Sequence, residues 1–354
     1  MAATPASVEF RHVTKRFGPV AAVNDVSFVV EPGTLVTLLG PSGCGKTTTL
    51  RLIAGLEMAS EGQVLIGQRD VTLLPATERD VSMVFQSYAL FPHMTVLENC
   101  AYGLLAMRRK RPQAHAAARE KLAQVGLTGF DNRLPSELSG GQQQRVAVAR
   151  ALVLEPQVLL FDEPLSNLDA KLRRRVREEI RELQQSLNLT VVYVTHDQQE
   201  ALAVSDKVIV MDNAVIAQEG APRDLYERPA NRFVAGFIGE ANLVQGRLRR
   251  TTDSLGIVAL GPLEIELPHR GAADGDVQVA IRPESLRIAT SPAAAAHLPG
   301  TIRKAAYLGE RMEYTVDTAI GELFVVDGAV AAPVSAGAAV YLMLAPHGVA
   351  VVLK

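Results

Sequence analysis

The fold of this 354-residue chain is decided by one stretch, Gly40-Pro41-Ser42-Gly43-Cys44-Gly45-Lys46-Thr47-Thr48. The stretch follows an apolar, β-rich run, Leu35–Leu39, and leads into Thr47–Ala54, whose apolar residues have helical spacing. A glycine-rich loop between a strand and a helix is the context that a phosphate-binding loop, or P-loop, requires. An ordinary glycine-rich turn is the alternative. The stretch therefore predicts an α/β fold of the P-loop NTPase type.

Each part of this P-loop answers a feature of ATP bound with Mg²⁺. The glycines let backbone N–H groups close around the β- and γ-phosphates, and the helix start adds the positive end of its dipole. Lys46 supplies a positive charge, and the Thr47 hydroxyl can ligate Mg²⁺. We expect all nine residues, Gly40–Thr48, to line the ATP site.

A second apolar run, Val158-Leu-Leu-Phe161, ends in the carboxylates of Asp162 and Glu163. Such a run is typical of a buried parallel strand, and the carboxyl ends of parallel strands face the ligand crevice. We expect Asp162 to hold Mg²⁺, directly or through water, and Glu163 to polarise the attacking water as general base. The alternative is two solvated acids that close a strand.

A second glycine-rich helix start occurs at Leu138-Ser139-Gly140-Gly141-Gln142. Ser139 is a good N-cap, and the two glycines would let backbone amides approach a γ-phosphate before a helix over Gln142–Leu154. A nucleotide that is held by the P-loop needs no second cradle in the same chain. The segment therefore favours a site completed by another copy, although a plain capped helix has the same pattern.

His196 follows Leu189–Thr195, a run rich in β-branched residues. A strand there would place the imidazole at a carboxyl end, where a donor could reach the γ-phosphate. We expect His196 to sense this phosphate, although a lone histidine is more often a packed or surface residue.

In these motifs the chain resembles the nucleotide-binding subunit of an ATP-binding cassette (ABC) transporter, and the resemblance covers the whole chain. The segments that carry it, besides the P-loop and Asp162-Glu163, are Lys15-Arg-Phe17-Gly, Val84-Phe85-Gln86-Ser87-Tyr88, Leu138-Ser-Gly-Gly-Gln142, Ser166-Asn-Leu-Asp169 and Thr195-His196-Asp197.

The resemblance implies a role for each segment. Phe17 occupies the place of the aromatic residue that stacks on adenine, where tyrosine is commoner in the family, so the stacking face is kept and the hydroxyl is lost. Gln86 corresponds to the glutamine that senses Mg²⁺ and the γ-phosphate. Ser139–Gln142 is the family's signature sequence, Asp169 belongs to its D-loop, and His196 is its switch histidine.

The pattern along the chain predicts two domains. Residues 1–239 would form the ABC ATPase: a RecA-like core, an antiparallel β subdomain over Val8–Val30, and a helical subdomain at about 93–154. Residues 240–354 show short alternating runs, which predict an all-β, OB-like accessory domain. Ile281-Arg-Pro-Glu284 and Tyr307-Leu-Gly-Glu310 resemble the TOBE domain of importer ATPases, and a structural and regulatory role is favoured over binding of oligonucleotides or sugars.

Composition limits the partners. The net charge is −2 and the pI about 6.4, and no basic stripe appears, so nucleic acid is not expected as a partner. Two cysteines form no disulfide framework, which fits a reducing compartment. No signal peptide is recognised at the N-terminus, and the apolar tract Ala329–Ala345 is interrupted by Pro333. The resemblance implies a peripheral protein on the cytoplasmic face of the bacterial inner membrane.

The resemblance implies the ATPase subunit of a bacterial ABC importer. It would act as a homodimer on two integral-membrane permease subunits. An external solute-binding protein would deliver solute to the permease and so act on the ATPase only indirectly. The runs Phe85–Met94 and Ile238–Val244 look closer to polyamine, ferric-iron and phosphonate importers than to sugar importers. The alternatives are a sugar importer ATPase, an exporter, and an ABC ATPase without a permease that acts in DNA repair or translation.

Overall fold

The computed structural model describes residues 5–166, 168–292, 297–345 and 347–353. The chain divides into two compact units, Met1–Pro222 and Arg223–Lys354. Asn167, in the D-loop-like segment, and residues 1–4, on which the absence of a signal peptide was judged, lie outside the described residues.

A six-stranded sheet is the centre of the first unit. The strands from β9 to β6 run parallel to their neighbours, and β10 is antiparallel at one edge. In sheet order they are β10 (Val215–Gly220), β9 (Lys207–Asp212), β3 (Leu35–Leu39), β8 (Thr190–Thr195), β7 (Val158–Asp162) and β6 (Val81–Val84). Every residue of β3 and of β8 is buried, as expected for strands covered on both faces. The predicted α/β core is confirmed.

Alternate side chains of these strands enter two different cores. Val36, Leu38 and Leu160 pack with α1 (Lys46–Ala54) and with a separate antiparallel sheet. Leu35, Leu159 and their neighbours pack instead with the helices on the opposite face. Those helices are α4 (Gly140–Leu152), α5 (Ala170–Leu187) and α6 (Gln198–Val204).

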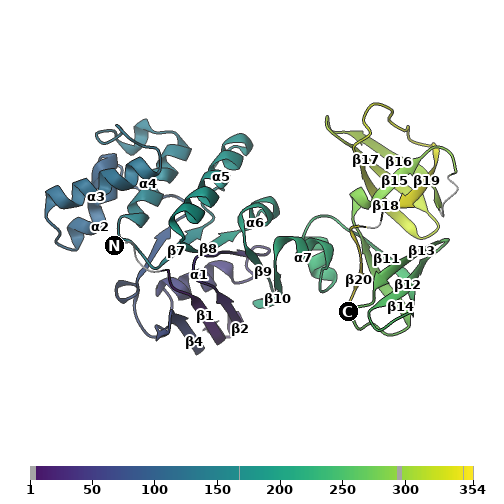
Figure 1. The fold of residues 1–354 in the computed structure, drawn as a ribbon, viewed down its shortest axis with the longest axis horizontal. Helices are drawn as coiled ribbons and strands as arrows, with labels where there is room; N and C mark the ends of the chain where they lie inside the picture. The colour runs from purple at the N-terminus through teal and green to yellow at the C-terminus, as the bar shows by residue number, and fades with distance from the viewer. Residues whose placement is uncertain (1–4, 167, 293–296, 346, 354) are drawn as a thin grey trace. The chain divides into compact units, whose positions relative to one another are not determined.

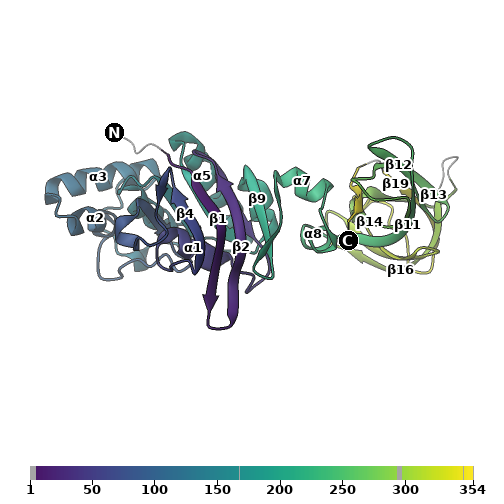
Figure 2. The ribbon, with the colours of Figure 1, turned by 90° about the horizontal axis from the view of Figure 1, so that it is seen from below.

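The predicted antiparallel β subdomain is a four-stranded sheet. Its strands, in sheet order, are β2 (Val20–Val30), β1 (Val8–Phe17), β4 (Glu61–Ile66) and β5 (Arg69–Asp70). Figure 2 shows β1 and β2 as a long hairpin. Phe10 and Phe28 stack between these strands with ring centroids 4.6 Å apart, so cross-strand aromatic packing fixes the hairpin against the core.

The predicted helical subdomain lies between β6 and β7 in the chain. It contains α2 (Val96–Ala106), α3 (Arg111–Gln124) and α4 (Gly140–Leu152), which pack on one another (Figure 1). Short 3₁₀ turns occur at Ala76–Glu78 and at Pro135–Glu137. The helix predicted over Gln142–Leu154 begins at Gly140, because Ser139 caps it directly.

The second unit is all-β apart from short helical segments. It holds α7 (Pro222–Glu227, whose first residue ends the first unit), α8 (Arg232–Phe237) and a 3₁₀ turn, Pro283–Ser285. One five-stranded sheet has the order β13 (Leu263–Pro268), β12 (Leu255–Leu260), β11 (Asn242–Arg250), β14 (Gly275–Ile281) and β20 (Val349–Val352). The other has the order β15 (Leu286–Ala289), β19 (Ala339–Leu344), β16 (Leu298–Tyr307), β17 (Met312–Thr318) and β18 (Gly321–Asp327).

All neighbouring strands in both sheets are antiparallel, and one apolar core joins the two sheets. The expectation of an all-β C-terminal domain is therefore confirmed. The two compact units divide at Pro222, the first residue of α7, which is earlier in the chain than Gly239, where the sequence predicts the domain boundary.

Candidate functional site

The P-loop connects β3 to α1, and two of its glycines are enforced by close backbone contacts. A Cβ at Gly40 would lie 2.3 Å from the carbonyl oxygen of Met211, and a Cβ at Gly45, where φ is +107°, would lie 2.3 Å from that of Ala22. A Cβ at Gly43 would meet nothing within 4 Å. The loop is thus tightly packed against neighbouring backbone at Gly40 and Gly45 and open at Gly43, as a phosphate-binding loop must be.

Lys46 is buried within this loop. Its ammonium donates hydrogen bonds to the carbonyl oxygens of Gly40 and Pro41, both at 2.8 Å, and its side chain is only 5% exposed. Among the described residues, no carboxylate forms an ion pair with it. A buried cation held only by neutral groups is a strong attraction for an anionic ligand, so the loop fits a polyphosphate.

Asp162 and Thr47 lie close together at the rim of the loop, where the Thr47 hydroxyl helps to stabilise the charged form of the Asp162 carboxylate. Burial and the nearby charge of Glu163 raise the pKa of Asp162 above its usual value. A divalent cation would offset both effects, and a hydroxyl with a carboxylate are oxygen ligands of the kind that Mg²⁺ takes. These two side chains therefore fit the predicted metal.

Glu163 and His196 lie together at the carboxyl ends of β7 and β8. The imidazole Nδ1 of His196 is 3.1 Å from a carboxylate oxygen of Glu163. The His196 side chain is 59% exposed and the Glu163 side chain 22%. The backbone of Glu163 is left-handed, with φ +45°, and its N–H donates to the carbonyl of Val194 at 3.0 Å. The turn directs this carboxylate out of the strand and toward His196.

A short chain of hydrogen bonds connects Gln86 to the same turn. The Gln86 amide donates to the Ser166 hydroxyl at 3.1 Å, and this hydroxyl donates to the carbonyl oxygen of Glu163 at 3.0 Å. Asp169 lies just beyond, where its carboxylate accepts the N–H of Leu172 at 2.9 Å and caps α5. A movement of the segment that carries Gln86 would thus be felt at Glu163.

The signature segment begins α4 with a complete capping box. The Ser139 hydroxyl accepts the N–H of Gln142 at 3.4 Å, and the Gln142 side chain accepts the N–H of Ser139 at 3.0 Å. Within the described residues, no hydrogen bond joins this segment to the P-loop. The two glycines also have a packing reason: a Cβ at Gly140 or Gly141 would lie 3.1 Å from Leu168 or Leu172 respectively.

Phe17 ends β1 with its ring 48% exposed, and the Lys15 ammonium lies 4.7 Å from the ring centroid. Apart from Phe17 and Asp169, the predicted site residues form two groups. One group holds Gly40–Thr48, Gln86, Asp162, Glu163 and His196, and the other is the signature segment.

A polar network beneath His196 was missed by the sequence analysis. Glu200, 3% exposed, accepts hydrogen bonds from the hydroxyls of Tyr193 at 3.2 Å and Thr195 at 2.8 Å. Arg173 pairs with Asp197 at 3.3 Å and with Glu200 at 3.7 Å. The available signal was a lone glutamate on the apolar face of α6, beside Ala201 and Val204.

This network borders a small cavity of about 40 Å³ that also touches the catalytic candidates. Its volume is enough for a water molecule. The residues that line it are Glu163, Ser166, Arg173, Thr195, His196, Asp197 and Glu200.

A separate groove of about 490 Å³ is lined by Phe85, the residue before Gln86 in the chain, and by residues of the core and of the helical subdomain. Its aromatic lining includes Phe85, Phe91 and Tyr102, and Phe85 and Tyr102 are 39% and 46% exposed. Arg150 donates to the carbonyls of Tyr88 and Ala89 at 2.7 Å and so holds the loop after Gln86. Exposed aromatic rings in a groove are typical of a protein contact surface.

Comparisons with known proteins agree with this geometry. The ABC transporter family model matches residues 23–166, and the TOBE domain model matches residues 279–352. Two relatives named Fe(3+) ions import ATP-binding protein, from Brucella abortus and Agrobacterium fabrum, are 60% and 59% identical over 92% and 91% of both chains. One of the same name from Escherichia coli is 48% identical over 96% of both chains.

Solved structures give the same result for the first unit. A dimeric bacterial ABC transporter cassette is 32% identical and covers 61% of this chain and 99% of its own, with a TM-score of 0.55. A post-hydrolysis dimer bound to ADP and phosphate is 33% identical, with the same coverage and a TM-score of 0.54. In the described part of the chain, no helix combines the length and the apolar character needed to cross a membrane.

Proposed function

This chain belongs to the ABC transporter family, as an ATP-hydrolysing importer subunit with a TOBE domain, and from that premise we propose that it drives the uptake of ferric iron. The name shared by its relatives at 57–60% identity supports the cargo. Polyamine and phosphonate were equally open from the sequence, and no residue described above distinguishes them.

The observation that carries the mechanism is the meeting of Glu163 with His196 at 3.1 Å, beside Asp162. Glu163 takes a proton from the attacking water as the oxygen reaches the γ-phosphorus, and ADP leaves. His196 orients the Glu163 carboxylate and donates toward the γ-phosphate. Mg²⁺, held by Thr47 and Asp162 with Gln86 nearby, would neutralise charge on the β- and γ-phosphates.

Lys46 and the amides of Gly40–Thr48 bind the phosphates, and the half-exposed Phe17 ring stacks on adenine. The signature segment completes the site of a second copy, because its hydrogen bonds within the described residues do not reach the P-loop of its own chain. Dimeric cassettes among similar structures support this homodimer. Two ATP molecules would therefore close the dimer, and hydrolysis would reopen it.

The groove with Phe85, Phe91 and Tyr102 is the surface that we assign to the permease. It is contiguous with Gln86, which hydrogen-bonds to Ser166 and through it to the turn of Glu163. Binding at this groove and chemistry at Glu163 are thereby mechanically linked. Bound to such permease partners, the protein would lie at the cytoplasmic face of the inner membrane.

The test is ATP hydrolysis by the chain assembled with its permease subunits, in vesicles that also hold the external binding protein. We expect ferric iron on the binding protein to stimulate hydrolysis and to enter the vesicles, while spermidine and methylphosphonate do neither. The Glu163→Gln assembly is the control for transport-coupled hydrolysis. Stimulation by spermidine, methylphosphonate or a sugar in place of ferric iron would refute the proposed cargo.

A further inference from the structure

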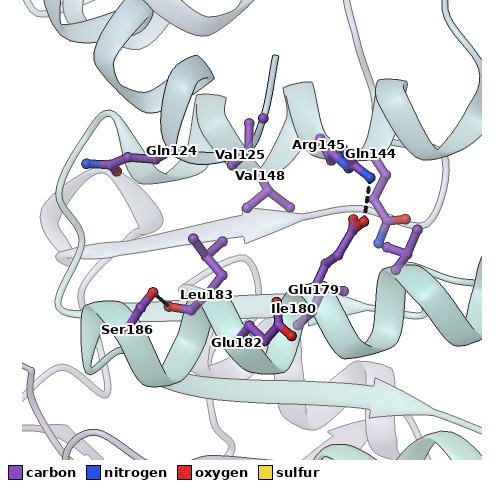
Figure 3. A pocket seen from close by; sticks show the side chains of 12 residues that line it. Gln124, Val125, Gln144, Arg145, Val148, Glu179, Ile180, Glu182, Leu183 and Ser186 are labelled. Atoms are coloured by element: carbon purple, nitrogen blue, oxygen red, sulfur yellow. Dashed lines mark hydrogen bonds and ion pairs between the residues drawn. The ribbon is translucent and has the colours of Figure 1, made fainter. Parts of the chain in front are cut away.

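A third cavity of the first unit lies away from the nucleotide site, between α4 and α5 (Figure 3). This α4–α5 cleft has a volume of about 450 Å³, within the range of pockets that hold small molecules. Its walls are apolar and come from both helices and from the end of α3. They are formed by Val125, Val148, Val176, Ile180 and Leu183.

One end of the α4–α5 cleft is polar and incompletely satisfied. Gln144 is 1% exposed, yet neither its amide nitrogen nor its amide oxygen has a hydrogen-bond partner among the described residues. Figure 3 shows this carboxamide reaching from α4 toward α5, on the side where Arg145 and Glu179 pair at 2.5 Å. Arg145 Nε and the second carboxylate oxygen of Glu179 also lack partners there.

Four unpartnered polar atoms at one end of an apolar cleft are costly. Each buried donor or acceptor that is left unsatisfied loses the hydrogen bonds that it made with water in the unfolded chain, and buried amides in native proteins nearly always have partners. This loss of free energy is offset if a bound group supplies the missing hydrogen-bond partners. Gln144 requires both an acceptor and a donor, side by side.

We propose that the α4–α5 cleft binds a small neutral molecule with a planar carboxamide or lactam on an apolar body. Such a group offers one acceptor to the Gln144 NH₂ and one donor to the Gln144 oxygen. A charged ligand is disfavoured because Glu179 is already neutralised by Arg145 and, at 3.1 Å, by Arg175. The apolar body would lie against Val148, Ile180 and Leu183, at the opposite end from the carboxamide.

Ordered water is the competing occupant, since a water molecule could also satisfy Gln144. Water and an amide ligand predict different responses to an apolar body. Water leaves the apolar walls without a partner, whereas the proposed ligand gains from both ends of the α4–α5 cleft. Two probes that differ only in the amide therefore separate the possibilities.

The probes are benzamide and toluene, titrated into the full-length chain without nucleotide, so that the result does not depend on the assignments for ATP hydrolysis. Binding is followed by calorimetry and by NMR of side-chain amides. We expect saturable binding of benzamide, with a shift of the Gln144 amide signals, and binding of toluene that is weaker by about tenfold, the factor expected for loss of one good hydrogen-bond pair.

Gln144→Met keeps the length of the side chain and removes the amide. We expect it to weaken benzamide by about tenfold and to leave toluene unchanged. Gln124→Met, at the exposed rim of the same cleft, is the matched control and should bind benzamide as the wild type does. If Gln144→Met does not fold, a crystal of the wild-type chain with benzamide replaces it.

The proposal is overturned if benzamide does not saturate, if toluene binds equally well, or if Gln144→Met binds benzamide as tightly as the wild type. A crystal that shows only ordered water at Gln144 in the presence of benzamide overturns it as well.

Discussion

The charged form of Asp162 is the form expected to hold Mg²⁺, yet it destabilises the folded protein when no cation is bound. Burial and the Glu163 charge raise its pKa above the ordinary value of 3.8. A carboxyl whose pKa is raised on folding binds more protons in the folded state. Stability therefore falls as the pH rises from about 3.8 through the raised pKa, and the whole cost is present at neutral pH.

We expect Asp162→Asn to stabilise the nucleotide-free protein at pH 7, by roughly 0.5 kcal/mol because the site is partly screened by solvent. The gain should vanish below about pH 4, where the wild-type carboxyl is protonated. Thermal unfolding measured from about pH 3.5 to about pH 8 tests both expectations, because this series begins near the ordinary pKa of a carboxyl group. Asp212→Asn is the control for removal of a nearby charge. A variant that is less stable than the wild type at pH 7 would contradict this reasoning.

Glu163 is the residue on which hydrolysis is expected to depend most. Glu163→Gln keeps the shape of the side chain and cannot take a proton, so turnover should fall by about 10²–10⁴ while ATP still binds. Single-turnover hydrolysis with the permease present, together with nucleotide binding by fluorescence, provides the measurement. Retention of turnover within about threefold of the wild type would show that the general base lies elsewhere.

At the scale of elements, the β8–α6 turn holds His196 through the network of Arg173, Asp197 and Glu200. Removing the Arg173 guanidinium leaves Glu200 buried without its cation and frees the Asp197 cap of α6. We expect Arg173→Met to destabilise the protein by about 1–2 kcal/mol, since the pair is one-third exposed on the arginine side. We also expect kcat to fall while KM for ATP changes little.

The matched control is Arg174→Met, one residue along α5, where the guanidinium is 77% exposed and, among the residues that the structure describes, pairs only with Glu178. It should leave both stability and kcat near the wild type, and Arg173→Lys should restore part of kcat. Equal effects of Arg173→Met on kcat and on KM would indicate a merely structural role, and the positioning role would have to be given up.

These elements also show what can be predicted from a sequence. The P-loop and Asp162–Glu163 were predictable because each is a contiguous segment in which residue types and order carry the chemistry. Arg173 and Glu200 were not predictable, since their meeting depends on how α5 and α6 pack on β8. The same holds for Gln144 on α4, because its surroundings include α5, which follows α4 in the chain only after β7. The signature glycines were predicted for phosphate approach, while their close contacts with Leu168 and Leu172 required the structure.

At the scale of the whole molecule, the proposed homodimer predicts complementation between two damaged chains. Lys46→Ala breaks the P-loop, and Ser139→Arg breaks the signature segment. Neither homodimer should hydrolyse ATP. In a mixed dimer one site combines both defects and the other combines two intact halves, so random mixing should restore roughly a quarter of wild-type turnover if the sites act independently.

Ser139→Asn is the control for folding, because it replaces the serine but keeps a side-chain oxygen that can cap α4. Hydrolysis is measured on purified chains mixed before assembly with the permease. If mixing restores nothing although mixed dimers are detected by cross-linking, each site is complete within one chain and the homodimer site is wrong.

Truncation tests how the two compact units share the work. Every candidate for ATP contact, from Phe17 to His196, precedes the structural division at Pro222. The segment after it belongs to the second unit: Leu225, Val234 and Ala235 are fully buried there. A fragment of residues 1–239 would keep these apolar residues and lose the strands that cover them.

The position of the cut should therefore decide whether a clean ATPase unit is obtained. In the second unit the Arg282 guanidinium, on the segment after β14, donates to the carbonyls of Tyr226, Ala235 and Glu240 at 2.7–3.1 Å. Without Arg282 the carbonyls of Tyr226 and Ala235 and the nearby apolar side chains become exposed, so a fragment 1–239 should aggregate more than a fragment 1–222. Both should bind ATP. Circular dichroism, light scattering and nucleotide binding compare them, and a fragment 1–222 that folds but binds no ATP would show that the second unit builds part of the nucleotide site.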